Sequence, residues 1–157
     1  MKNEDSTQIF EVFVDADSCP VKDEIELVAE SYKVKVTFVS SYAHNMTVGP
    51  TSKVVMVDAE REAVDLYIAN HIKKKDVCVT HDYGLASLLL TKGATVISPR
   101  GQMFDHTIID SLLAQRHQSQ KDRRAGKKTK GPRAYLKGDR ERFIQQFEKI
   151  LSNRAGI

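Results

Sequence analysis

The chain has 157 residues, of which 41% are hydrophobic and 29% are charged, with a formal net charge of +3. This length and composition suit one globular domain with its own core, and they exclude a disordered chain. No apolar run is long enough to cross a bilayer, and the first residues are polar where a signal peptide would be apolar. We therefore expect a soluble, cytoplasmic protein with no membrane partner.

The apolar pattern alternates between short runs rich in Val, Ile and Phe and longer stretches with helical spacing. This alternation is typical of βαβ units, and such strands suit a sheet that is buried on both faces. We therefore predict an α/β fold with a mainly parallel sheet. In chain order, the predicted strands cover residues 9–14, 34–40, 53–57, 77–80 and 95–97, and the predicted helices cover residues 21–32, 60–73, 84–92, 107–118 and 139–151.

Carboxylates follow two of the predicted strands at the point where each strand ends. Asp15 and Asp17 come directly after the first strand, and Asp82 follows the fourth. Ligands of open α/β sheets collect at the carboxyl ends of the strands, so these side chains are expected at one edge. Asp65 lies beside the apolar stripe of the helix predicted at 60–73 and is expected to face the same edge. The plainer interpretation, that Asp17 and Asp82 only cap helices, stays open.

Four carboxylates in one pocket would repel one another, and some would be driven to bind protons. A divalent cation removes this conflict, and ligation by carboxylate oxygens favours Mg²⁺ or Mn²⁺ over zinc or copper. One or two such ions could activate water for attack on a phosphodiester and stabilise the leaving oxygen. The predicted metal ligands and catalytic residues are therefore Asp15, Asp17, Asp65 and Asp82.

The two cysteines, Cys19 and Cys78, each lie next to one of the strand-end acids. A reducing compartment argues against a lasting disulfide, and their spacing is not that of a zinc site. Cys78 alternates with apolar neighbours, which indicates a core residue. Cys19 lies near a helix start, where a thiol pKa can be lowered. No histidine is placed to act with it, so we predict a structural role for both.

Residues 115–142 form a basic segment with eleven Lys or Arg and three acids, a net charge of +8, whereas the rest of the chain carries −5. Turn residues at 126–132 predict a flexible loop within it. We thus expect one domain over residues 1–157, with a basic loop and helical region at about 115–157. Such a charge run is often merely solvated, but beside an acidic metal pocket it could bind phosphates. The candidate phosphate contacts in it are Arg116, Arg124, Lys127 and Lys128.

Three further residues are candidate substrate contacts. His81 precedes Asp82 and could touch a phosphate or a metal-bound water. Arg100 follows the last predicted strand, where its planar donors could hold a phosphate at the pocket rim. Asn45 lies in the loop after the second strand and could reach the same edge. Solvation of Arg100 and an ordinary turn role for Asn45 are alternatives of similar weight.

The motifs strung along the chain also resemble the YaiI/YqxD family, which is regarded as PIN-domain-like. The resemblance is carried by residues 13–22, Asp65 and residues 79–86, 92–94 and 99–101, and it extends through 131–132 and 139–143. It implies a PIN-like parallel α/β/α sandwich. PIN domains are metal-dependent nucleases with an acidic cluster at the strand ends, and by this resemblance Asp15, Asp17, Asp65 and Asp82 correspond to the acidic positions.

The function that these observations favour is a divalent-metal-dependent nuclease, and the preference for RNA over DNA follows from the resemblance alone. Two alternatives remain. A non-catalytic nucleic-acid-binding module would bind in a salt-dependent manner that is indifferent to Mg²⁺. A phosphatase would instead use Asp15 as a nucleophile and form an aspartyl phosphate.

Overall fold

The computed structural model describes residues 10–41, 47–60, 62–129 and 133–155. Within them, a five-stranded sheet has the order β3-β2-β1-β4-β5, and all of its neighbouring strands are parallel. The strands are β1 (Val12–Asp15), β2 (Val36–Ser40), β3 (Ser52–Met56), β4 (Val77–Val79) and β5 (Thr95–Ile97). The helices are α1 (Lys22–Ser31), α2 (Ala63–His71), α3 (Tyr83–Thr91), α4 (His106–Arg124) and α5 (Lys137–Ala155).

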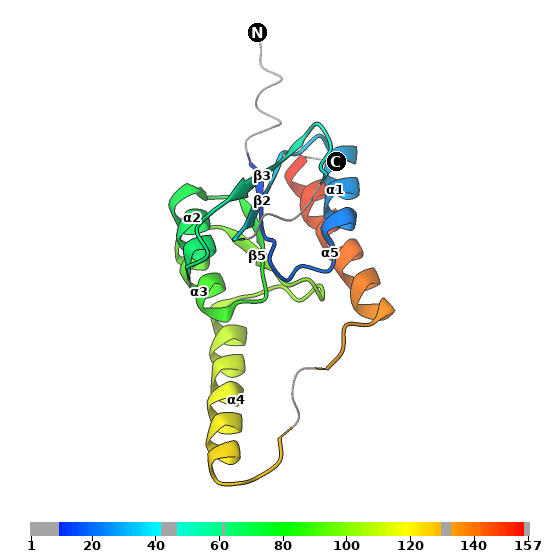
Figure 1. Ribbon diagram of the computed structural model, residues 1–157. Helices are drawn as coiled ribbons and strands as arrows, with labels where there is room; N and C mark the ends of the chain where they lie inside the picture. Colours follow the sequence, from blue (N-terminus) through cyan, green and yellow to red (C-terminus); the bar gives the residue numbers. More distant parts are fainter. Residues whose placement is uncertain (1–9, 42–46, 61, 130–132, 156–157) are drawn as a thin grey trace.

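Helices cover both faces of the sheet, as Figure 1 shows, with α1 and α5 on one side and α2 and α3 on the other. Side chains of successive strand residues point to opposite faces, and the two apolar cores follow this rule. Val12 and Val14 pack with Phe143 and Phe147 of α5 in one core. Phe13 packs with residues of α2, α3 and α4 in the other. The predicted three-layer α/β/α sandwich is confirmed.

The carboxyl end of the central strand β1 lies between the carboxyl ends of β2 and β4. Asp15 is in register with Val39 of β2, and Val14 is in register with Val79 of β4. Because all five strands are parallel, the chain leaves every one of them at the same edge of the sheet. The residues that directly follow β1, β2, β4 and β5 therefore lie at this edge, which we call the carboxyl edge.

Helix α4 projects away from the sandwich (Figure 1), and the chain returns from its far end to the start of α5. Of the 19 residues of α4, Ile109 in its first turn is the one that is buried. The helix therefore packs against the sandwich only near its start. The predicted end at residue 118 is wrong, because the helix continues to Arg124 and carries the basic side chains up to that point. Residues 126–129 are not helical, as predicted, and 130–132 lie outside the described residues. In the described part of the chain, no helix has the length and apolar character needed to span a membrane.

Candidate functional site

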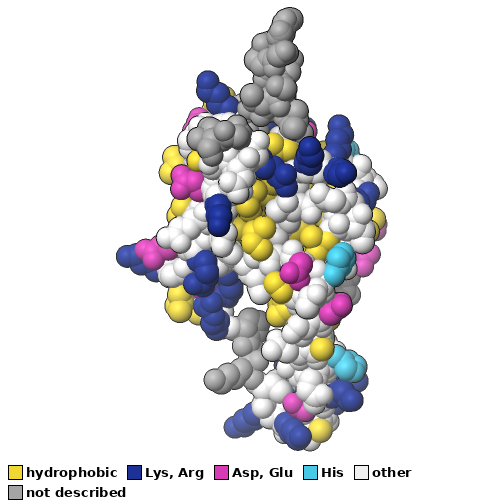
Figure 2. Space-filling view, turned by 180° about the vertical axis from the view of Figure 1, so that it is seen from behind, with side chains coloured by type: hydrophobic (Ala, Val, Ile, Leu, Met, Phe, Trp, Pro, Cys, Tyr) yellow, Lys and Arg dark blue, Asp and Glu magenta, His cyan; other side chains and the backbone are white. Residues whose placement is uncertain are grey.

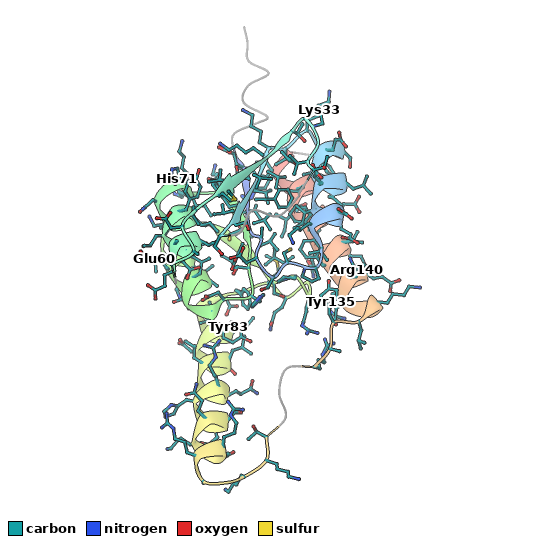
Figure 3. All side chains as sticks on the ribbon, in the orientation of Figure 1. Lys33, Glu60, His71, Tyr83, Tyr135 and Arg140 are labelled. Carbon is teal, nitrogen blue, oxygen red and sulfur yellow. The ribbon has the colours of Figure 1, made fainter. Side chains whose placement is uncertain are left out.

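The carboxyl edge holds a pocket of about 610 Å³ between the sheet and the starts of α2 and α3. All four predicted aspartates line it, together with two glutamates that precede α2. In full, the lining residues are Asp15, Asp17, Ser41, Ala59, Glu60, Glu62, Val64, Asp65, Leu66, Asp82, Gly84, Leu85 and Leu88. Figure 3 shows labelled Glu60 at the α2 side of this edge. The prediction that the acids converge agrees with this placement.

Asp15 and Asp82 are linked by the buried hydroxyl of Thr80. This hydroxyl donates to Asp15 Oδ2 at 2.8 Å and accepts from the backbone N–H of Asp82 at 3.0 Å. Asp82 also caps α3, since its Oδ1 accepts from the N–H of Leu85 at 2.9 Å. The capping interpretation of Asp82 is therefore correct, and the same side chain still lines the pocket.

Asp17 has a different local role. Its Oδ1 accepts from Ser40 Oγ at 2.8 Å and from the N–H of Ser41 at 3.0 Å, and its Oδ2 accepts from Ser41 Oγ. Asp17 does not cap α1, because the cap residue there is Val21 and no side chain bonds the helix start. The carboxylate instead joins the end of β2 to the loop after β1, which holds the pocket wall in place.

Two pocket acids, Asp15 and Asp65, have a raised pKa. Burial, helped by the charges of Asp82, Asp15 and Glu62, raises the pKa of Asp65 to about 6. Burial also raises the pKa of Asp15, against the hydrogen bond from Thr80 and the charge of His81, while Asp82 and Asp17 raise it further. These are the shifts expected where like charges share a partly dehydrated site. The pocket therefore favours whatever adds positive charge to it, a proton or a cation.

The donors fit a hydrated Mg²⁺ or Mn²⁺ in chemistry, though they do not form a closed cage. All are carboxylate oxygens, and Mg²⁺ is commonly held by one or two carboxylates, with waters and substrate phosphate completing its shell. Among the described residues, no three His, Cys, Asp or Glu side chains are grouped closely enough to bind a metal by themselves. Asp15, Asp65 and Asp82 line this pocket, whereas both carboxylate oxygens of Asp17 already accept hydrogen bonds from Ser40 and Ser41, so the first three are the best placed ligands.

The remaining predicted substrate contacts are spread over the carboxyl edge. His81 is exposed and close enough to Asp15 for its charge to lower that pKa. Arg116 lies over the Tyr83 ring at 4.8 Å, at the point where α4 meets the start of α3. Arg100 donates to Asp139 and is not among the lining residues, so it does not hold the rim of this pocket.

The other three predicted contacts in the basic segment lie at the free end of α4. Arg124, Lys127 and Lys128 are exposed there, far along the helix from the pocket. Figure 2 shows Lys and Arg side chains at this end of the molecule and on the side of the body near the return of the chain. Asn45 lies outside the described residues.

Both cysteines are free and buried, as predicted. Burial raises the pKa of the Cys19 thiol to about 11 and that of Cys78 well above its usual value. The possibility that the Cys19 pKa is lowered is therefore wrong, because loss of hydration raises it by more than the backbone hydrogen bond at Val21 and the charge of Lys22 lower it. Neither thiol is placed to react as a thiolate.

Several polar residues of the site escaped the sequence analysis. Thr80 and Ser41 each follow directly on a strand, and both bond a pocket aspartate. Glu62 has a φ of 76° just before α2, and it lines the pocket with Glu60. In the sequence, the helix dipole is a sufficient explanation for both glutamates. A signal for Thr80 was available, since a hydroxyl two residues before a strand-end acid can reach backbone and carboxylate together.

The fold and the pocket define a class, a parallel α/β/α sandwich with clustered carboxylates at the carboxyl edge of its sheet. The chain belongs to the YaiI/YqxD family, whose model is described as uncharacterized and matches residues 13–153. It is 49% identical over 147 residues to a UPF0178 protein of Bacillus velezensis, covering 93% of this chain and 88% of that protein. It is 46% identical over 144 residues to one of Shouchella clausii, covering 92% and 94%. No solved structure matches the chain.

Proposed function

We propose that the protein is a divalent-metal-dependent nuclease that hydrolyses phosphodiester bonds, with RNA preferred over DNA. One observation carries the proposal: Asp15, Asp65 and Asp82 face a single pocket at the carboxyl edge, where burial and the neighbouring acids raise the pKa of Asp15 and Asp65. The volume of about 610 Å³ suits a nucleotide-sized group, since ligand pockets commonly measure a few hundred Å³ or more. The PIN-like character of the fold and the choice of RNA remain part of this proposal.

The residues of this chain would each have a defined task. Asp15, Asp65 and Asp82 would hold Mg²⁺ or Mn²⁺, which when bound supplies activation of water and stabilisation of the leaving oxygen. Thr80 keeps Asp15 and Asp82 in register, and Asp17 keeps Ser40 and Ser41 in place behind them. Exposed His81 and the basic residues of α4 would contact the substrate phosphates. Two free, buried cysteines accord with a reducing compartment, so we place the activity in the cytoplasm.

The test is a calorimetric titration of metal-free protein with Mn²⁺ and Mg²⁺, followed by cleavage assays on labelled RNA and DNA. The double variant Asp15→Asn/Asp82→Asn suits it, because Asn caps helices as well as Asp does, and α3 keeps its start. Asp110→Asn, which removes an exposed charge on α4, is the matched control. We expect the double variant to lose metal binding and cleavage while the control keeps both.

Other outcomes would support the rival functions. A folded double variant with full metal-dependent cleavage would contradict the nuclease proposal. Nucleic-acid binding that falls with salt but ignores Mg²⁺, with no cleavage, would indicate a binding module. A covalent phosphate on Asp15 would indicate a phosphatase.

A further inference from the structure

A second charged group lies at the carboxyl edge, on the side of α5. The carboxylate of Asp139 is almost fully buried, with a side-chain exposure of 1%, and it pairs with three arginines from separate parts of the chain. Arg100 after β5 approaches it at 2.9 Å, Arg133 before α5 at 2.5 Å and Arg142 within α5 at 2.6 Å. We call Asp139 and these three arginines the arginine cluster.

The arginine cluster is held rigidly by its surroundings. Arg133 binds Asp139 through two nitrogens, and the N–H of Leu136 adds a further bond at 2.9 Å. Arg142 Nε donates to the carbonyl oxygen of Arg100 at 3.2 Å, and Arg100 donates to the carbonyl oxygens of Arg133 and Ala134. These bonds, first of all the one from Arg133, hold the pKa of Asp139 well below its usual range.

Backbone geometry brings the arginines to one place. Gly101 has a φ of 88°, and a Cβ on it would lie 2.8 Å from backbone atoms of Arg142 and Phe143. The loop after β5 can therefore press directly against α5. Tyr135 fastens the same junction, because its hydroxyl donates to the carbonyl oxygen of Pro99 at 2.7 Å. Figure 3 shows labelled Tyr135 and Arg140 at the start of α5, across the lower end of the body from Tyr83.

The charges of the arginine cluster do not balance. One carboxylate faces three guanidinium groups, which leaves an excess of two positive charges in a small volume. One arginine is enough to neutralise one carboxylate, and side-chain exposures of 33% for Arg100, 56% for Arg133 and 52% for Arg142 leave these cations open to solvent. Guanidinium groups bind phosphate through paired N–H donors, and those already fixed in position lose less entropy on binding.

We propose that Arg100, Arg133 and Arg142, oriented by Asp139, form a binding site for a phosphate group. Where the protein acts as the nuclease proposed above, that group is a backbone phosphate of the bound strand, and this assignment of the source rests on that function. Arg100 follows β5 and Asp82 follows β4, and these are parallel neighbours, so the site lies on the same edge as the acidic pocket. One strand crossing the carboxyl edge would meet both.

The test measures binding without cleavage. A short fluorescein-labelled single-stranded RNA is titrated by anisotropy in the presence of a chelator, over a series of salt concentrations. The variant Arg133→Gln/Arg142→Gln is compared with the control Lys33→Gln/Lys35→Gln, which makes the same change in net charge among exposed residues. Figure 3 places Lys33 at the upper end of the sandwich and Tyr135 at its lower end. Arg142→Gln alone is the second variant, because Arg100 and Arg133 still neutralise Asp139 in it.

We expect the arginine variants to weaken RNA binding several-fold more than the control, with thermal unfolding still cooperative. The slope of log K against log salt should become shallower by about 0.7 for each RNA phosphate that the variant no longer neutralises. Equal effects of the arginine variants and the control on RNA binding, together with no arginine-dependent binding of inorganic phosphate, would overturn the site. Calorimetry with inorganic phosphate forms a second arm: binding of phosphate that needs the arginines, with RNA binding unaffected, would support the site and assign it to free phosphate.

The two proposals can fail separately. A wild-type protein that never cleaves but shows the arginine-dependent salt slope would contradict the nuclease proposal and keep the phosphate site. A protein that cleaves with metal, and in which neither RNA affinity nor phosphate binding depends on the arginines, would keep the nuclease and overturn the site.

Discussion

Neutralising one pocket acid should stabilise the protein. In Asp65→Asn, a carboxyl whose ionisation is opposed by burial and by Asp82, Asp15 and Glu62 becomes an uncharged amide of the same shape. Removal of a surface charge elsewhere, as in Asp110→Asn on α4, should have little effect. A gain in stability on removing this charge would show that the clustered acids destabilise the folded protein. Such destabilising groups are common at binding and catalytic sites.

The size of the gain follows from the pKa of Asp65. A shift from 3.8 to about 6 corresponds to about 3 kcal/mol at face value. Because Asp65 is only half-buried, screening by water reduces this to about 1 kcal/mol. For a chain of this length, 1 kcal/mol raises the melting temperature by about 2 to 4 °C.

The pH dependence has a definite sign. The folded state binds the Asp65 proton more tightly than the unfolded state, so wild-type stability falls as the pH rises from 3.8 through about 6. The gain of Asp65→Asn should therefore be complete above about pH 6 and absent below the ordinary value of 3.8. Thermal and urea unfolding of both proteins across this range measure it, with chelator present. A variant that is destabilised at neutral pH, or equally stabilised at both ends of the range, would refute the reasoning.

Three other substitutions or treatments have definite outcomes. Gly101→Ala should cost more than Gly126→Ala in urea unfolding, since φ is 88° and 83° but a Cβ meets backbone only at Gly101; equal losses would contradict the close approach. Thr80→Val should cost about 1 to 2 kcal/mol in the same assay, because two buried hydrogen bonds at Asp15 and Asp82 lose their partner; an unchanged stability would mean that the link carries no energy. Trypsin should cut first within residues 121–128, where α4 stands away from the core, and both fragments should stay together through α5. First cleavage within α1 or α3 would contradict the projecting arrangement.

Much of the fold could be predicted because its signals are local. All five strands and five helices found in the described residues were expected from apolar spacing. The predictions were wrong at helix ends, because the local backbone conformation determines where a helix stops. Helix α4 continues to Arg124 because Gly126, with a φ of 83°, ends it in the left-handed conformation favoured there. The rise in charge from residue 115 suggests an earlier end, but lysine and arginine are good helix formers.

The acidic pocket could be anticipated from strand ends, whereas the contacts that shape it could not. Asp15 and Thr80 are 65 residues apart, and their bond depends on β1 and β4 being neighbours. The placement of Arg100 was missed for a related reason. No local sequence pattern indicates that Asp139 is buried. A buried carboxylate is costly unless it is paired, and Arg100 pairs with Asp139 near α5 instead of lying at the pocket rim.

Asp139 thereby keeps the two charged groups of the carboxyl edge separate. A guanidinium that reached Asp15, Asp65 or Asp82 would pair with these carboxylates and occupy the place of a metal ion. Instead burial raises the pKa of Asp65, and the charges that act most strongly on it are Asp82, Asp15 and Glu62, all of them acidic. Arg100 stays bound to Asp139. The acids therefore remain open to a cation while the arginines remain open to an anion, which is the arrangement that a phosphodiester bound at both sites would require.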